Sequence, residues 1–257
     1  AALSQAGVEV HVLDEPAVAS SPDAVFPNNW VSLHHDGTVV LYPMLAPSRR
    51  RERRLEFLAD LEARGGFAVS RLVDLTHHEL ADRFLEGTGS VVFDHASRVA
   101  YACISPRTDV AVLDELCEEL GYEPFVFEST DVDGVPVYHT NVVLSIGRRV
   151  AVVCAESVPE ARRGALIERL SAAGREVISI DRRQMAQFAG NVLEIEARDG
   201  ASVLAMSESA RLGFGAASLE ALQRRVDRVV AVPIPTIEHR GGGSVRCMLA
   251  EVFLPRA

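Results

Sequence analysis

The sequence has little of several features that define common classes of protein. It contains four cysteines in 257 residues, and none of them forms a short-spaced pair, so neither a disulfide framework nor a cysteine-based zinc site is expected. No apolar run reaches the length of a membrane span. No Gly-Lys-Ser or Gly-Lys-Thr follows the glycine-rich stretch, as a phosphate-binding loop requires. We therefore expect a cytoplasmic protein without a metal, a cofactor or a membrane partner.

Positive charge is also scarce. The chain has 26 Lys and Arg residues against 36 Asp and Glu residues, a net charge of −10. A nucleic-acid-binding surface needs an excess of positive charge, so nucleic acid is not an expected partner. An acidic chain is compatible with a small cationic or zwitterionic substrate. No linker, charge block or low-complexity stretch divides the sequence, and we expect one domain over residues 1–257.

The sequence contains instead a unit that recurs four times. Each unit has a hairpin, a helix and a further strand, and the hairpin turns lie at positions 36, 96, 147 and 199. Turns spaced by about 50 to 60 residues indicate a repeat architecture. Four units and a leftover strand from Val245 predict an α/β ring of five ββαβ units. The first unit is incomplete, since the chain opens inside a helix end, and we expect a missing N-terminal segment.

Local patterns predict the elements of this ring. In the first unit we expect a strand at 8–13, a hairpin within 25–44, a helix at 49–64 and a strand at 67–75. In the third unit the first strand is expected at 137–145. The last strand is expected to begin at Val245, directly after three glycines.

Polar residues recur where the first hairpin strand of each unit begins. Because the loops of a ring converge on its axis, side chains at equivalent positions are expected to share one site. A carboxylate, an imidazole and a thiol at such positions can act as an orienting group, an acid/base and a nucleophile. Each residue alone has a structural explanation, such as a buried core cysteine, but their coincidence favours a catalytic site. The residues are Asp23, Asn28, Asn29, Glu86, His139, Asn141 and Cys247.

Four stretches resemble the guanidine-modifying, or amidinotransferase-related, superfamily. They are Pro-Asp-Ala-Val-Phe at 22–26, Glu86-Gly87, the segment around His139, and Gly-Gly-Gly-Ser-Val-Arg-Cys at 241–247. The superfamily has the pentein fold, a five-bladed α/β propeller, which is the fold that the resemblance implies. It implies Cys247 as the nucleophile, His139 as the general acid/base and Glu86 as the carboxylate that orients the substrate nitrogens.

The same resemblance implies a set of substrate-binding residues. Asp23 matches an aspartate that faces the site, and Arg107 and Arg50 match arginines that hold the carboxylate of an amino acid. An arginine can bind a carboxylate through two hydrogen bonds, which fits this role. Which of Arg49, Arg50 and Arg51 faces the site stays open.

Three neutral amides set this sequence apart from deiminase-like members of the superfamily. Asn28, Asn29 and Asn141 stand where those proteins have acidic residues. A guanidinium group carries only donors and favours carboxylates, whereas a neutral ureido group has a carbonyl oxygen that an asparagine amide can donate to. The chain therefore resembles most the citrulline-hydrolysing group. We expect hydrolysis of citrulline to ornithine, carbon dioxide and ammonia through a covalent adduct on Cys247.

Alternatives remain open at this point. An arginine deiminase or a dimethylarginine dimethylaminohydrolase is the first, and an amidinotransferase is the second. A non-catalytic pentein protein, such as a ribosome anti-association factor or an amino-acid sensor, is the third. A homodimer is possible.

The remaining cysteines and histidines have structural interpretations. Cys103, Cys117 and Cys154 follow apolar patterns and are expected in the core. Two histidine pairs have no ligand-like companions in the sequence and are expected at the surface. Trp30 either lines the site or fills the interior. The histidine pairs are His34-His35 and His77-His78.

Overall fold

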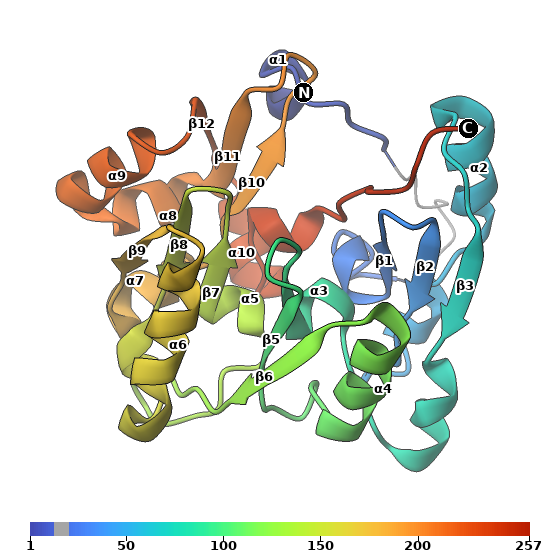
Figure 1. The fold of residues 1–257 in the computed structure, drawn as a ribbon, viewed down its shortest axis with the longest axis horizontal. Coiled ribbons are helices and arrows are strands. Elements are labelled where there is room, and N and C mark those ends of the chain that lie inside the picture. Colours follow the sequence, from blue (N-terminus) through green and yellow to red (C-terminus); the bar gives the residue numbers. More distant parts are fainter. Residues whose placement is uncertain (13–20) are drawn as a thin grey trace.

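Four small sheets surround a common axis in the computed structural model, which describes residues 1–12 and 21–257 (Figure 1). Each sheet has three strands: two form an antiparallel hairpin, and the third runs parallel to the second. The strands of the successive sheets are β1 (Val31–Leu33), β2 (Thr38–Leu41) and β3 (Arg71–Asp74); β4 (Val91–Asp94), β5 (Val99–Cys103) and β6 (Glu123–Phe127); β7 (Leu144–Ile146), β8 (Val150–Val153) and β9 (Glu176–Ser179); β10 (Leu193–Glu196), β11 (Ser202–Ser207) and β12 (Arg228–Val232).

A helical crossover joins the second and third strands of every sheet, because a parallel pair cannot be closed by a tight turn. In the second unit this is α4 (Val110–Leu120), which begins at the cap residue Asp109 and ends at Gly121, whose φ of 68° favours glycine. Its buried face packs on the sheet. The other helices are α2 (Glu56–Gly65), α6 (Glu160–Ala172), α7 (Arg182–Ala186), α8 (Glu208–Gly213), α9 (Gly215–Gln223) and α10 (Pro235–Gly241), with 3-10 turns η2 (Arg49–Glu52), η3 (Thr76–Ala81) and η4 (Ala155–Ser157).

The two ends of the chain lie beside the first and fourth sheets. The N-terminal helix α1 (Ala2–Gln5) and the buried Val8 pack on the fourth sheet. The C-terminal segment pairs with the first unit through single bridges, Val252 with Leu33 and Arg256 with Phe67. Arg256 also bonds both carboxylate oxygens of Glu9 at 2.8 Å. The predicted α/β fold of repeated units in small mixed sheets is thus confirmed.

Four local predictions differ from the structure. The strand expected from Val245 is a 3-10 turn, η5 (Val245–Met248), and the beginning of the strand expected at 137–145 is the short helix α5 (Thr140–Val143). The helix expected at 49–64 is broken at Arg53, whose ψ of 92° is extended. Residues 8–12 form no strand, and position 13 lies outside the described residues. Residues 245–248, residues 140–143 and Val8 contact other units, and these contacts outweigh the local pattern. Arg53 instead bonds Tyr42 and Glu79 within the first unit.

The core is divided among the units. Cys103, Cys117 and Cys154 are buried, as predicted. Trp30 fills the core of the first unit, with its ring 5.2 Å from that of Phe57. His34 was expected at the surface but is buried, because Ser32 satisfies its imidazole at 2.7 Å. None of the helices among the described residues is long and apolar enough to cross a membrane.

Candidate active site

Single helical turns stand at the start of the first strand in three units and near the end of the chain. They are η1 (Pro27–Asn29), α3 (Gly87–Ser90), α5 and η5. α3 packs against both η1 and α5, and η1 packs against η5. Asn28 and Asn29 lie in η1, and Asn141 and Cys247 lie in α5 and η5. Glu86 and His139 are the cap residues of α3 and α5. The repeat therefore brings these predicted residues onto turns that pack against one another.

His139 and Glu86 form a buried pair. The Nε2 atom of His139 lies 2.9 Å from Oε2 of Glu86, and the same oxygen accepts a hydrogen bond from Nη1 of Arg107 at 3.0 Å. The backbone N–H of Leu45 donates to the other oxygen at 3.1 Å. Burial alone would raise the pKa of Glu86, but the hydrogen bond from His139 and the charges of its cationic neighbours hold that pKa at about 2. Burial lowers the pKa of His139, which the carboxylate of Glu86 partly opposes.

Cys247 contacts two asparagines from different units. The Nδ2 group of Asn191 donates to Sγ of Cys247 at 3.2 Å, and Sγ lies 3.7 Å from Oδ1 of Asn141. Asn191 also donates to the backbone oxygen and to Oδ1 of Asn141, at 3.0 and 3.2 Å. Burial raises the pKa of the thiol, and the bonds from Ser244 and Asn191 act in the opposite direction. The resting site thus favours a neutral thiol, and the donors from Ser244 and Asn191 would stabilise a thiolate once it forms.

Asn191 was missed by the sequence analysis. It lies two residues before β10 and is fully buried. Asn141 lies three residues before β7, so the two asparagines occupy similar places in the fourth and third units. The repeat was therefore the signal that could have identified it, because the fourth unit had been left without a candidate residue.

A glycine permits the close packing of these turns. A Cβ atom at Gly89 would lie 2.5 Å from Nδ2 of Asn29 and 2.8 Å from the ring of His139. Contacts this short are not compatible with a side chain. Gly89 therefore lets α3 hold the imidazole of His139 and the amide of Asn29 side by side.

Arg49 lies in the buried polar cluster, and Arg50 lies outside it. Arg49 donates to Oδ1 of Asn29 at 2.7 Å and to both carboxylate oxygens of Glu52, and its Nη1 atom is 4.0 Å from Glu86. Arg50 donates to the backbone oxygen of Met44 and pairs with Glu79 at 3.2 Å. Asp23 is half-buried, and its backbone oxygen accepts from Arg49. The expected substrate-binding roles of Arg50, Arg107 and Asp23 stay predictions.

Several buried amide atoms have no hydrogen-bond partner within the described part of the chain. They are both polar side-chain atoms of Asn28, Nδ2 of Asn29 and Oδ1 of Asn191. Buried polar groups are usually satisfied, so such atoms gathered on adjacent turns indicate a place for a polar ligand. In Asn29 the Oδ1 atom accepts from Arg49, so that among the described residues only its Nδ2 group is left without a partner.

Tyr138 and the glycine-rich segment lie beside the nucleophile. The hydroxyl of Tyr138 donates to the backbone oxygen of Gly242, and its ring is 5.7 Å from the guanidinium of Arg107. Burial raises the pKa of Tyr138, and the charge of Cys247 adds to this effect. Cys247 and His139 are each 3% exposed, whereas the side chain of Arg107 is 34% exposed. The side chain of Arg107 therefore reaches from the buried Glu86 to solvent.

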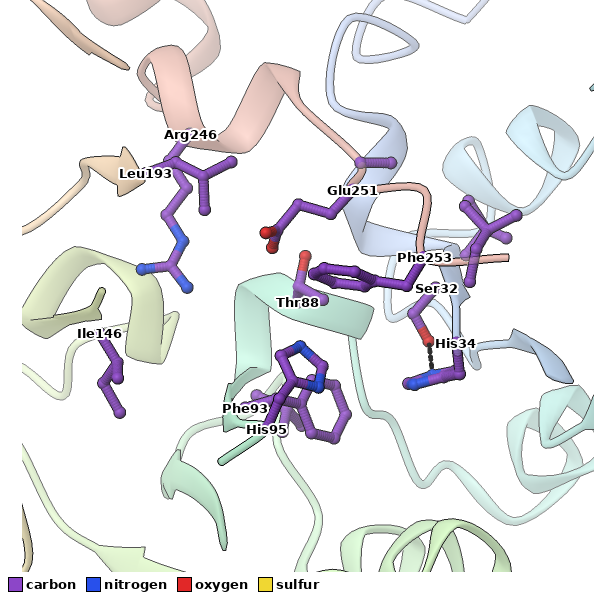
Figure 2. Close-up of a pocket in the computed structure, with 14 residues that line it drawn as sticks. Ser32, His34, Thr88, Phe93, His95, Ile146, Leu193, Arg246, Glu251 and Phe253 are labelled. Carbon is purple, nitrogen blue, oxygen red and sulfur yellow. Dashed lines mark hydrogen bonds between the residues drawn. The ribbon is translucent and has the colours of Figure 1, made fainter. Parts of the chain in front are cut away.

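A separate polar cavity of about 50 Å³ is lined in part by Arg246, the residue before Cys247 in the sequence (Figure 2). Arg246 and Glu251 both point into it, together with Thr88. Burial lowers the pKa of Arg246 and raises that of Glu251 to about 7, opposed by Arg246. Neither His139 nor Cys247 lines this cavity. It is therefore distinct from the cluster of catalytic candidates.

A buried thiol and a histidine–carboxylate pair on the turns of repeated ββα units are the arrangement that the sequence analysis expected of the guanidine-modifying, pentein superfamily. The model of the family described as N,N dimethylarginine dimethylhydrolase, eukaryotic, matches residues 1–254. The chain belongs to this family and is a guanidino-group hydrolase of the pentein superfamily. No curated protein sequence matches the chain.

Solved structures of the same fold are more distant in sequence. The N-terminal domain of ArgZ, an arginine dihydrolase from the ornithine–ammonia cycle in Cyanobacteria, has a TM-score of 0.68 at 20% identity, over 93% of this chain and 80% of that one. Unliganded AgrE has a TM-score of 0.69 at 21% identity. The match covers 93% of this chain and 32% of AgrE. SxtG, an amidinotransferase from Microseira wollei in the saxitoxin biosynthetic pathway, has a TM-score of 0.59 at 14% identity, over 86% and 65% of the two chains. These likenesses support the fold alone.

Proposed function

We propose that this protein hydrolyses the terminal C–N bond of a guanidino amino acid, arginine or a methylated arginine, through a covalent adduct on Cys247. The observation that carries the proposal is that the thiol of Cys247 accepts a hydrogen bond from Asn191. Cys247 lies on one of the turns that pack together near the buried His139–Glu86 pair. The family match supports a guanidino substrate. On this point the comparisons favour a substrate class that the sequence analysis had placed second to citrulline.

The first half of the reaction forms the adduct. The thiol of Cys247 gives its proton to His139, and the thiolate then attacks the guanidino carbon, forming a C–S bond. The C–N bond to the leaving amine breaks, and the imidazolium of His139 gives its proton to that amine. Asn191 stabilises the thiolate by donating to Sγ, while Glu86 holds the imidazole and stabilises its charged form.

The second half releases the enzyme. His139, now neutral, takes a proton from a water molecule whose oxygen attacks the adduct carbon. The C–S bond then breaks and the thiolate is regenerated, so that the net change is the replacement of an amine by an oxygen. An arginine substrate gives citrulline and ammonia, and a dimethylated arginine gives citrulline and dimethylamine. We propose that Arg107, which is partly exposed and pairs with Glu86, receives the carboxylate of the amino acid.

The test is an assay of amine release with arginine, dimethylarginine and citrulline offered separately, together with mass spectrometry of the intact protein. We expect turnover of one guanidino substrate and a mass increase that is absent in Cys247→Ser. His139→Gln is expected to lose turnover while the protein stays folded. Full activity of Cys247→Ser, or no adduct with any of the three substrates, contradicts the covalent mechanism.

A second candidate substrate, citrulline, is favoured by one specific observation. Within the described ranges, 1–12 and 21–257, the Nδ2 group of Asn29 is a buried donor without a partner, and the bond from Arg49 to Oδ1 sets its orientation. A guanidinium group offers no acceptor to this donor, whereas the carbonyl oxygen of a ureido group does. With citrulline the same steps would yield ornithine, ammonia and carbon dioxide.

The substitution Asn29→Asp separates these two substrates. It replaces the free donor by an acceptor while keeping an oxygen for Arg49. If the donor serves a ureido oxygen, kcat/KM for citrulline falls about 10- to 100-fold, in line with one unmatched buried polar group, and binding of arginine tightens. If both affinities fall alike, Asn29 is a packing residue and the citrulline candidate loses its support. The covalent mechanism is unaffected by either outcome.

A further inference from the structure

A cluster of possible metal ligands lies on the first two units, apart from the residues of the candidate active site. His77 and His78 lie on η3, which follows the first sheet, and Glu115 lies on α4 of the second unit. One ligand atom from each of the three residues lies within 4.8 Å of the other two. The sequence analysis found no ligand-like companion for the two histidines, and the folded chain brings Glu115, 37 residues after His78, beside them. We name these residues the His77 cluster.

The orientation of His77 suits a ligand. Its Nδ1 atom lies 3.2 Å from the backbone oxygen of Asp74, so Nδ1 carries the proton and Nε2 keeps a free lone pair. An imidazole that binds a metal usually donates its other N–H in this way. The Nε2 atom of His77 lies 3.9 Å from Oε1 of Glu115, which is too long for a hydrogen bond. The bond to Asp74 therefore leaves this nitrogen directed towards the carboxylate without forming a bond to it.

The two histidine–carboxylate distances within the cluster lie on either side of the separation expected for two ligands of one ion. With metal–ligand bonds of about 2.0–2.2 Å, two tetrahedral ligands lie about 3.3–3.6 Å apart. The His77–Glu115 separation of 3.9 Å is slightly longer than this, and the His78–Glu115 separation of 2.8 Å is slightly shorter. Small side-chain rotations bring both into range, with the ion taking the place of the proton between His78 and Glu115.

The donor set selects a class of ion. Two imidazoles and one carboxylate suit zinc and similar first-row divalent ions, whereas calcium and magnesium prefer oxygen ligands alone. The side chains of His77 and Glu115 are 59% and 40% exposed, and that of His78 is 12% exposed. Solvent can therefore reach the cluster and supply the fourth ligand.

We propose that the His77 cluster is a surface site for a divalent transition-metal ion, with zinc as the ion that fits it best. The ion is held by Nε2 of His77, Nε2 of His78 and the carboxylate of Glu115, with water completing a tetrahedron. Because η3 and α4 belong to neighbouring units, the bound ion links these units and stabilises the folded chain. This site is independent of the proposed hydrolysis.

The test is a zinc titration by calorimetry at a pH above the ordinary histidine pKa, in the Cys247→Ser background, because a thiol would otherwise bind zinc itself. We expect one zinc ion per chain, and at least tenfold weaker binding after His77→Ala or Glu115→Gln. Both changed side chains are partly exposed, so the variants are expected to fold. The visible spectrum of bound Co²⁺ is expected to show tetrahedral coordination.

The matched control is His11→Ala. His11 also bonds a carboxylate, Glu9, at 2.9 Å, but it belongs to no cluster of three ligands among the described residues. Its removal is expected to leave the zinc affinity unchanged. At a zinc concentration 100-fold above Kd, the folding equilibrium constant should rise about 100-fold in the parent and not in His77→Ala. Equal affinities of the parent and both cluster variants, or no binding at all, overturn the proposal.

Discussion

Asn191 is the residue whose side chain donates directly to the candidate nucleophile. Its Nδ2 group lies 3.2 Å from Sγ of Cys247, in a place where burial disfavours the thiolate. A hydrogen bond to a charged group contributes about 1.5–3 kcal/mol, more than a neutral one. Asn191 therefore acts on the ionisation of the thiol and not only on its position.

The substitution Asn191→Ala is expected to raise the pKa of Cys247, because it removes a hydrogen-bond donor to the thiolate. The measurement is the rate of alkylation of the thiol as a function of pH, with Cys247→Ser as the blank. The kcat/KM at neutral pH should fall about 10- to 100-fold. An unchanged alkylation profile with reduced activity would mean that Asn191 only positions its neighbours.

Glu86 is the residue whose ionisation the fold favours most clearly. Its pKa is lowered from 4.5 to about 2, so its contribution to stability is fully present above the unfolded pKa and is lost as the pH falls towards the folded one. We expect Glu86→Gln to be less stable than wild type by on the order of 3 kcal/mol at neutral pH. Urea unfolding at several pH values should show this difference shrinking as the pH falls below about 4.5. A difference that does not change with pH would contradict the assignment.

The single helical turns are the elements that build the site, and the sequence indicated their residues better than their shape. The repeat predicted Glu86, His139, Asn141 and Cys247 at equivalent positions, but it predicted the last three as strand residues. Each of their segments forms a single turn that packs against the turn of a neighbouring unit, and a local pattern does not contain such a contact. The sequence analysis could not decide that Arg49 points into the buried cluster, because Asn29 and Glu52 set the direction of its side chain only in the folded chain.

Gly89 tests whether these turns must pack closely. In Gly89→Ala the new methyl group meets the amide of Asn29 and the ring of His139, and one of them must move. We expect kcat/KM to fall about 100-fold, as for a displacement of a catalytic group by about 1 Å, with a loss of about 1–3 kcal/mol in the free energy of unfolding. The measurements are steady-state kinetics and urea unfolding.

The control for this change is Gly164→Ala in α6. A Cβ atom there meets nothing within 4 Å. Because alanine is the better helix former, the free energy of unfolding should rise by up to about 1 kcal/mol and the activity should not change. If both variants lose activity, the effect at Gly89 does not arise from its close contacts.

At the scale of the whole molecule, ion pairs recur between neighbouring units. The first residue of each third strand in the first three units pairs with a residue in the last turn of the next unit's crossover helix or just after it: Arg71 with Glu119, Glu123 with Arg169, and Glu176 with Arg225. The sequence contains no lysine, so each cation in these pairs is an arginine. The repeat could predict the strands, but not these pairs, because the partners come from different units and change sign between them.

One inter-unit pair differs from the others because it is buried. Arg175 contacts Asp94 through two hydrogen bonds of 2.7 and 2.8 Å and donates from Nε to the backbone oxygen of Gly147. The side chains are 5% and 0% exposed. Burial would raise the pKa of Asp94, yet the bonds from Arg175 and Ser97 hold it below its ordinary value. The second and third units are therefore joined by a buried ion pair, and removing either partner would leave the other charge buried without a counterion.

The substitution Arg175→Met is expected to lower the free energy of unfolding by about 3–5 kcal/mol, because it leaves the carboxylate of Asp94 buried without its cation. Arg225→Met removes an exposed pair of the same kind and should cost at most about 1 kcal/mol. Urea unfolding of both variants gives the comparison. The double change Asp94→Asn and Arg175→Met should recover part of the loss, since no buried charge is then left unpaired. Equal costs for Arg175→Met and Arg225→Met would show that burial does not decide how strongly these units are joined.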